Sequence, residues 1–454
     1  LRTAPAHVLA AGARVGSDGR PLDEGSGAPA PLGDPTAHWG QGAPTFRFLS
    51  MSATRFDPGD LAELRSVWGA RLPDRAVYDF IVATKQKEVL APNLPLLYRI
   101  AGVDGYDGGV LPLRRYVTLQ RLFLAPEQIL PDGRLREQLR EVPPAKLLAL
   151  LNVEYVITDK VQDVWLEDVF YDLQFGATLS QGGAGEVEVE NPYPFVATAF
   201  GLALQTEAGQ GPPAGAPALA VSWRDDAGQR YERTLAAGAT TGDYTARLRL
   251  DAPTRPQDIR LRWVGAAGRL RVRGLTLIDE RAGTHRSLIV SDRGRFRLTH
   301  SGDVKVYRNL ENLPRAYWVS GARVIADDEA AIAVMRDAGF DPRRAVILHA
   351  GAERAPLPSA QSRVELRAYA AGRVEVFCEA DAPGYLVLSD AHYPGWRVEV
   401  DGRPAALERA NVLLRAVEVP AGRHVVVFRY APAWLWPAAL LSLLAVAALL
   451  CLIR

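Results

Sequence analysis

Hydrophobic and polar residues alternate with a period of two along two separate parts of this chain. In the segment DIRLRW, Ile259, Leu261 and Trp263 face one way and the intervening arginines face the other. Similar short strands follow one another without helical patterns between them, which is typical of β-sandwiches. The pattern therefore predicts two sandwiches, an inserted jelly-roll-like one at 181–299 and a membrane-proximal one at 363–430.

Two other parts of the chain alternate between helical and strand patterns. In PPAKLLALLNVEYVITD, a helix begins behind two prolines and is followed by the β-branched strand VEYVIT. Further along, strands are expected at Ala316–Val319 and Ala345–Leu348, on either side of a helix at 327–337. The alternation predicts an α/β domain in two parts, 45–180 and 300–362. VEYVIT and VKVYRN are expected to share one sheet, with the first sandwich inserted between them.

The two ends of the chain differ in composition. Residues 1–44 are rich in Gly, Ala, Pro, Asp and Ser, which predicts a flexible linker. Residues 434–453, WLWPAALLSLLAVAALLCLI, carry no charge and are long enough as a helix to span about 30 Å of hydrocarbon. Trp434 and Trp436 stand where interfacial aromatics belong. We expect a transmembrane helix; a buried helix of a soluble domain, the alternative, would normally show a polar face.

The predicted fold class is therefore α+β and mainly β, with one C-terminal membrane helix. The chain has 53 basic against 52 acidic residues, which gives no electrostatic argument for a nucleic-acid partner. Of the two cysteines, Cys378 and Cys451, the second lies in the apolar tail, so we expect no structural disulfide. Because the sequence begins with Leu1 and not with Met, we expect it to be part of a longer product.

The turn VDGYDGG offers the main candidate for ligand chemistry. Asp104 and Asp107 are carboxylates on a glycine-rich turn beside Tyr106, which suits contact with a carbohydrate hydroxyl or a metal ion. The alternative is a plain turn in which aspartates hydrogen-bond their own backbone and glycines adopt positive φ. The tryptophans Trp223 and Trp263 could stack on sugar rings, but their alternation with arginine favours the core.

No catalytic residue or metal site is predicted. The histidines are scattered and none has the spacing of a metal site; they are His7, His38, His285, His300, His349, His392 and His424. There is no Gly-x-Ser-x-Gly motif and no phosphate-binding glycine loop. A glycosidase would need two facing carboxylates, and no pair stands out.

The segment SDAHYPGWRVEVDGRP predicts an aromatic bend followed by a hairpin. Pro394 fixes φ and Gly395 permits a positive φ, so the chain is expected to turn ahead of Trp396, which we place in the core. The pair Asp401–Gly402 suits a two-residue hairpin loop.

Four segments together resemble the YfhO-type bacterial membrane proteins, which are similar to type-C glycosyltransferases. They are VDGYDGGVLPLRRYV, LLNVEYVIT, VYRNLENLPRAYWV and LSDAHYPGWRVEVDGRPAALERANVLLRAVEVPAGRHVVVFRYAP. They are spread over most of residues 94–430, and the run from Tyr393 to Tyr430 before the apolar tail is the most specific. Residues 1–90 match weakly.

The resemblance implies a polytopic parent protein with an extracytoplasmic domain, residues 1–430, and a final membrane helix. Arg454, which follows the apolar run, indicates a cytoplasmic C-terminus. The resemblance also implies sugar transfer from a lipid-linked donor to a cell-envelope acceptor. The catalytic acids of such enzymes lie in an early extracytoplasmic loop that has no counterpart here. This chain is then expected to recognise a glycan acceptor and support the catalytic core, without a cofactor of its own, with the bilayer, an envelope glycan or a lipid-linked sugar as partners.

A membrane-anchored carbohydrate-binding or adhesin-like surface protein without catalytic activity is the alternative. The gene segment upstream of Leu1 separates the two: many hydrophobic spans favour the transferase, and a lone signal peptide favours the adhesin.

Overall fold

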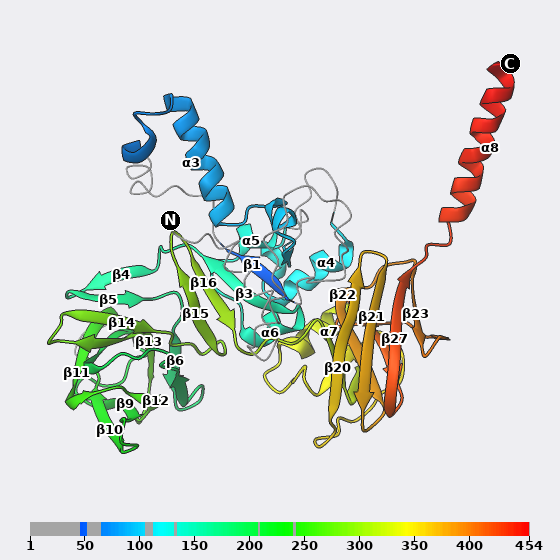
Figure 1. The fold of residues 1–454 in the computed structure, drawn as a ribbon. Helices are drawn as coiled ribbons and strands as arrows, with labels where there is room; N and C mark the ends of the chain where they lie inside the picture. Colours follow the sequence, from blue (N-terminus) through cyan, green and yellow to red (C-terminus); the bar gives the residue numbers. More distant parts are fainter. Residues whose placement is uncertain are drawn as a thin grey trace.

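The structure is a computed structural model in which the chain forms a mainly β protein with three β-rich parts and an isolated C-terminal helix (Figure 1). The described residues are 46–51, 65–104, 112–130, 134–207, 209–238 and 242–453. The expected linker at 1–44 lies outside them. Within the last helix, the side chains of residues 436, 447–448 and 451–453 are also outside the description.

A five-stranded sheet forms the centre of the molecule, in the order β15-β16-β3-β1-β2. Its strands are β1 (Arg47–Ser50), β2 (Ala101–Gly102), β3 (Val153–Thr158), β15 (Phe296–Ser301) and β16 (Lys305–Asn309). Strand β3, the segment VEYVIT, pairs antiparallel with β16, so the predicted sharing of one sheet is confirmed. Both faces of β3 are buried, since Val156 and Ile157 belong to different core clusters. This explains its nearly continuous apolar sequence.

Apart from α8, the helices of the described residues are mostly short. They are α3 (Asp74–Glu88), η1 (Leu94–Tyr98), α4 (Arg114–Leu119), η2 (Gln120–Leu122), η3 (Pro126–Gln128), α5 (Leu135–Gln138), α6 (Ala145–Leu150) and α7 (Asp328–Arg336). Helix α6 begins directly after Pro144, as the sequence predicts. Helix α7 begins after Asp327, whose Oδ1 accepts a hydrogen bond from the Ala330 amide at 2.8 Å.

The inserted part is a β-sandwich of two antiparallel sheets, drawn green in Figure 1. One sheet has the order β10-β9-β12-β7 and the other β11-β8-β13-β14, with β6 also paired to β13. Trp223 and Trp263 are 3% and 7% exposed in the core between the sheets, so their predicted burial is confirmed. The jelly-roll connectivity stays a prediction.

The strands of this sandwich and of the hairpin beside it are β4 (Asp163–Leu166), β5 (Val169–Asp172), β6 (Ala177–Ser180), β7 (Glu186–Val189), β8 (Ala197–Thr206), β9 (Pro217–Arg224), β10 (Arg230–Ala236), β11 (Gly242–Thr254), β12 (Gln257–Trp263), β13 (Arg269–Asp279) and β14 (Thr284–Leu288).

The C-terminal sandwich packs a six-stranded sheet, β17-β22-β26-β25-β19-β18, against a five-stranded sheet, β20-β21-β27-β23-β24. Its strands are β17 (Ala316–Val319), β18 (Gly321–Val324), β19 (Ala345–Leu348), β20 (Ser362–Ala370), β21 (Arg373–Ala380), β22 (Gly384–Ala391), β23 (Trp396–Val400), β24 (Arg403–Ala405), β25 (Glu408–Ala410), β26 (Leu414–Val419) and β27 (Gly422–Tyr430).

The segment 300–362 contributes to two different sheets. Strand β16 pairs with β3 in the central sheet, whereas β17 pairs antiparallel with β22 of the C-terminal sandwich. Strands β18 and β19 belong to that same six-stranded sheet. The expected division at residue 363 therefore does not coincide with a boundary between sheets, because strand pairing depends on partners far away in the sequence.

Helix α8 (Leu435–Ile453) extends away from the C-terminal sandwich (Figure 1). Its described leucines are largely exposed, with Leu441 at 70% and Leu443 at 67%. Among the described residues, no helix meets the length and apolarity required of a membrane span.

Candidate functional site

The first candidate residue from the sequence, Asp104, forms a buried ion pair. Its Oδ2 accepts a hydrogen bond from Arg136 Nε at 2.7 Å, and the two side chains are 6% and 9% exposed. Arg136 also donates to the Leu90 carbonyl at 3.1 Å. Burial raises the pKa of Asp104, although Arg136 acts in the opposite direction. This carboxylate therefore joins α5 to the end of β2.

Asp104 also borders a cavity of about 180 Å³ whose wall includes Phe48 and Gly102. The other two members of the predicted site, Tyr106 and Asp107, lie outside the described residues. Contact of this turn with a carbohydrate or a metal ion stays a prediction. Within the described part of the chain, no three His, Cys, Asp or Glu residues are arranged to hold a metal ion.

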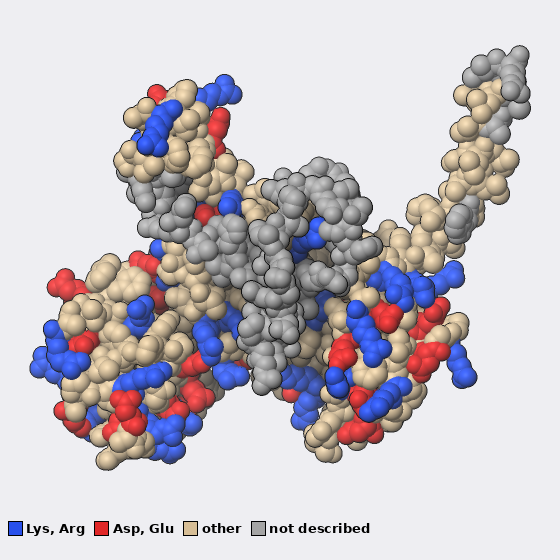
Figure 2. All heavy atoms as spheres, in the orientation of Figure 1, with Lys and Arg blue, Asp and Glu red and all other residues tan. Residues whose placement is uncertain are grey.

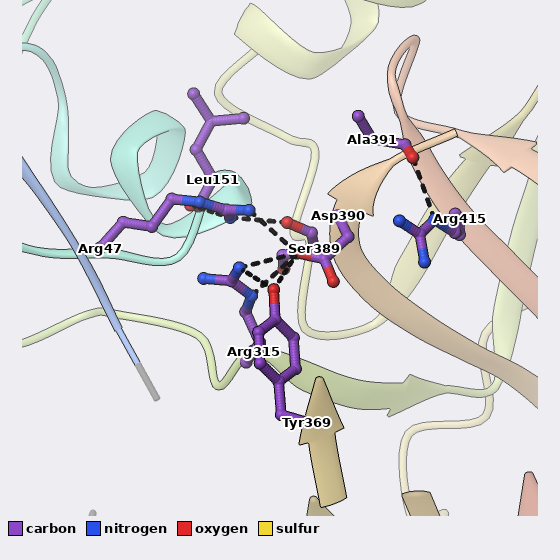
Figure 3. A network of polar contacts seen from close by, with 8 residues as sticks. All are labelled: Arg47, Leu151, Arg315, Tyr369, Ser389, Asp390, Ala391 and Arg415. Atoms are coloured by element: carbon purple, nitrogen blue, oxygen red, sulfur yellow. Dashed lines mark hydrogen bonds and ion pairs between the residues drawn. The ribbon is translucent and has the colours of Figure 1, made fainter. Parts of the chain in front are cut away.

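A larger polar cluster, which sequence reasoning missed, joins the central sheet to the C-terminal sandwich. We call it the Asp390 junction; it consists of Arg47, Arg315, Tyr369, Asp390 and Arg415 (Figure 3). These side chains come from β1, the segment before β17, β20, β22 and β26.

The local structure of β22 directs Asp390 out of its own sheet. The pairing of β22 with β26 is interrupted between Leu388 and Ala391, so the ladder is irregular at Ser389 and Asp390. The Ser389 amide donates a hydrogen bond to the Arg315 carbonyl at 2.8 Å. The Ser389 carbonyl accepts a hydrogen bond from Arg47 Nη1 at 2.6 Å. The irregularity thus makes both backbone and side chain of this segment available to the central sheet.

One carboxylate oxygen of Asp390 receives most of the contacts. Its Oδ1 lies 3.0 Å from Arg47 Nη2, 2.8 Å from Arg315 Nη2 and 3.2 Å from the Tyr369 hydroxyl. Arg47 also donates to the Leu151 carbonyl at 3.0 Å. Two guanidinium groups and a phenol from different elements therefore converge on one buried acid.

The charges at the junction are fixed at neutral pH. Burial alone would raise the pKa of Asp390, but Arg315, Arg47 and Arg415 outweigh burial and lower it. Burial lowers the pKa of Arg47 and of Arg415 to about 10, so both remain protonated at pH 7. A carboxylate with a lowered pKa and several donors is a poor proton acceptor. The arrangement therefore suits a structural joint better than general-base catalysis.

The aromatic bend follows directly and contacts the segment that leads into α8. Gly395 has φ of 102°, and a Cβ at this position would lie 2.9 Å from the Tyr430 ring. Its carbonyl accepts a hydrogen bond from the Ala431 amide at 2.7 Å. Trp396 packs on Tyr430 with ring centroids 5.4 Å apart, while Arg415 lies 3.6 Å above the Trp396 ring.

Trp396 is thus partly buried at the edge of the core, whereas we predicted that it lies within the core. The loop Asp401–Gly402 has φ of 52° and 75°, and Val400 pairs with Arg403 across it, which confirms the predicted two-residue hairpin. The bend therefore connects the Asp390 junction at one end of its segment to the base of α8 at the other.

Residues 358–442 match the model of a protein family described as bacterial membrane protein YfhO. We call this stretch, which is similar to that family, the YfhO-family region. The YfhO-family region begins just before β20, includes the bend and the hairpin, and ends within α8. No curated protein sequence matches the chain.

Solved structures give only distant likenesses. The arabinofuranosyltransferase AftD from Mycobacteria is 11% identical, with 69% of this chain and 24% of that chain covered and a TM-score of 0.15. A mutant of AftD gives 13% identity, 64% and 25% coverage and a TM-score of 0.14. A mutant of Bacillus subtilis oxalate decarboxylase OxdC gives 9% identity, 60% and 74% coverage and a TM-score of 0.11. The chain spans about a quarter of the length of AftD, and likenesses this weak carry no argument.

Proposed function

We propose that this chain is the extracytoplasmic C-terminal region of a polytopic membrane protein that transfers a sugar from a lipid-linked donor to an acceptor in the cell envelope. In this proposal the region recognises the glycan acceptor and supports a catalytic core located upstream. The observation that carries it is the YfhO-family region, which runs without interruption from the C-terminal sandwich into α8.

The proposal gives α8 the role of a membrane helix. Its described large side chains are exposed, including those of Leu440, Leu441, Leu443 and Leu444. Across the described residues of α8, Ser442 is the only polar side chain, so the helix has no polar face. Figure 2 shows the same property, because the described residues of α8 carry no charge while both sandwiches carry charges of both signs. Transfer of each leucine from water to hydrocarbon is worth about 1.5–3 kcal/mol.

The orientation follows from the same proposal. Residues 1–430 would lie outside the cytoplasm, and Arg454 would follow the helix on the cytoplasmic side. The lipid-linked donor would bind the upstream part of the parent protein, and an envelope glycan would contact the β-sandwiches described above.

Deletion of the gene that encodes this chain tests the proposal. The sugar composition of purified cell envelopes is compared among the parent strain, the deletion strain and a strain complemented with the intact gene. We expect one envelope sugar to decrease on deletion and to return on complementation. An unchanged composition would contradict the proposal and favour the membrane-anchored carbohydrate-binding or adhesin-like alternative.

A further inference from the structure

A polar cleft lies beside the inserted sandwich, far in sequence from the YfhO-family region. It has a volume of about 380 Å³, and its lining includes four arginines and three glutamines. We call it the arginine cleft and define it by Arg140, Arg271, Arg273 and Arg293. A volume of a few hundred cubic ångströms is typical of sites for small ligands.

The arginines reach the cleft from two sides. Arg271 alternates on β13 with Val272, which is buried in the core of the sandwich, so the Arg271 guanidinium faces away from that core. Arg273 stands where the pairing of β13 with β8 is irregular, and it also lines the cleft. Gln205 of β8 stands opposite Arg271 in the sheet and also lines the cleft. Arg140 precedes α6 on the other side.

Arg293 belongs to this second wall and is fixed there. It lies between β14 and β15 and donates a hydrogen bond to the Val142 carbonyl at 3.0 Å. The walls therefore belong to two parts of the fold that already contact each other.

The cleft carries a surplus of positive charge. Arg273 pairs with Asp243 and Arg293 pairs with Glu141. Across the described ranges, Arg140 and Arg271 have no ion-pair partner, and Glu141 is the one acidic residue in the lining. The Arg271 guanidinium lies close to Gly176, where an added Cβ would come within 3.4 Å of its Nε. The glycine leaves space for this side chain, which remains available to a ligand.

We propose that the arginine cleft binds an acidic glycan, meaning an oligosaccharide that carries carboxylate or phosphate groups. Guanidinium groups bind both anions through paired hydrogen bonds. Glutamine amides, which can donate and accept, suit the hydroxyl groups of a sugar. The inference rests on the proposed function and narrows it, because it names the chemical class of the glycan that this region recognises.

Titration calorimetry on the purified full chain tests the inference. The probes are trigalacturonate, its neutral counterpart galactotriose, and glucose 6-phosphate, which separates carboxylate from phosphate as the source of charge. We expect an acidic probe to bind and to bind more weakly as salt increases, because exposed charge pairs are screened. We expect galactotriose to bind at least about tenfold more weakly, which corresponds to a difference of about 1.4 kcal/mol.

Three variants locate the site. Arg140→Gln and Arg271→Gln should each weaken acidic-probe binding about tenfold or more, the effect of losing about 1.4 kcal/mol. Arg230→Gln is the matched control, because Arg230 is an exposed strand arginine on β10 of the same sandwich and outside the cleft. Unchanged circular dichroism and thermal midpoints show that the variants remain folded.

The inference is overturned if no acidic probe binds, if galactotriose binds equally well, or if Arg230→Gln weakens binding as much as Arg271→Gln. These results are distinguishable from failure of the proposed function. If gene deletion removes an envelope sugar but the purified chain binds no acidic probe, the proposed function stands and only the acidic-glycan inference fails.

Discussion

Asp390 carries more of the long-range polar contacts than any single residue that the sequence singled out. It accepts hydrogen bonds from Arg47, 343 residues away, and from Arg315, 75 residues away. Local sequence shows only an acid at the end of the apolar strand GYLVLSDA, which hints that the acid has a partner. It cannot identify that partner, because the fold alone brings β1 and β22 together.

The same limit applies to Asp104. The sequence singled out this residue for the glycines that follow it, but its partner Arg136 is 32 residues away and was not foreseen. By contrast, Gly395 and the Asp401–Gly402 loop were predictable, because their backbone conformations depend on neighbouring residues alone.

Replacing Asp390 by asparagine should destabilise the fold strongly. The variant retains the shape of the side chain and removes the charge that offsets the surrounding guanidinium groups, so we expect a loss of about 3–5 kcal/mol in unfolding free energy. Urea unfolding measures it. Asp251→Asn is the control, since Asp251 pairs with Arg233 on an exposed surface, and it should change stability by less than about 1 kcal/mol. Equal effects of the two variants would disprove the structural role of the Asp390 junction.

The contribution of Asp390 should also depend on pH. Its pKa is lower in the folded protein than the value of about 3.9 in an unfolded chain. The folded state therefore favours the ionised form, so the stabilisation is present above about pH 4 and disappears as pH falls through the folded-state pKa. We expect the stability difference between the wild type and Asp390→Asn to shrink between pH 5 and pH 2. A constant difference over that range would show that the charge of Asp390 is not responsible.

Replacing Gly395 by alanine should destabilise the fold where the bend packs against Tyr430, just before α8. The backbone φ of 102° is unfavourable for alanine, and the added Cβ would approach the Tyr430 ring to 2.9 Å. A loss of about 1–3 kcal/mol in unfolding free energy is expected. Gly372→Ala is the control, because a Cβ there meets nothing within 4 Å and the φ is not positive. If both glycines tolerate alanine equally, the close packing of the bend against Tyr430 is not important.

At the scale of elements, the sequence predicted strand positions better than strand partners. The strands at Ala316–Val319 and Ala345–Leu348 have the predicted bounds. Their assignment to the C-terminal sandwich was not visible in the sequence. Alternation along a strand reports which residues face inward, whereas the choice of a neighbouring strand depends on the packing of whole sheets.

The proposed role of α8 leads to a prediction for this element. The chain of residues 1–454, expressed in a bacterium, should remain with the membrane fraction after an alkaline carbonate wash. A chain that ends at residue 433 should be released by the wash, because it lacks the apolar helix whose leucines would contact lipid. Immunoblots of the two fractions provide the measurement. Release of the full chain by carbonate would contradict a membrane-spanning α8.

At the scale of the whole molecule, the central sheet joins two sandwiches that have different relations to the proposed function. The C-terminal sandwich contains the YfhO-family region and leads to α8, while the inserted sandwich contributes to the arginine cleft. The Asp390 junction holds the central sheet against the C-terminal sandwich. The proposed membrane helix and the proposed glycan-binding cleft are therefore joined through the central sheet.

Sugar transfer by isolated membranes tests whether the parent protein is a glycosyltransferase. Membranes from the parent, deletion and complemented strains are incubated with purified acceptor envelopes from the deletion strain and with radiolabelled lipid-linked sugars. We expect parent and complemented membranes to incorporate one labelled sugar into the acceptor, and deletion membranes to incorporate none. Equal incorporation by all three membranes, for every sugar offered, would contradict this expectation.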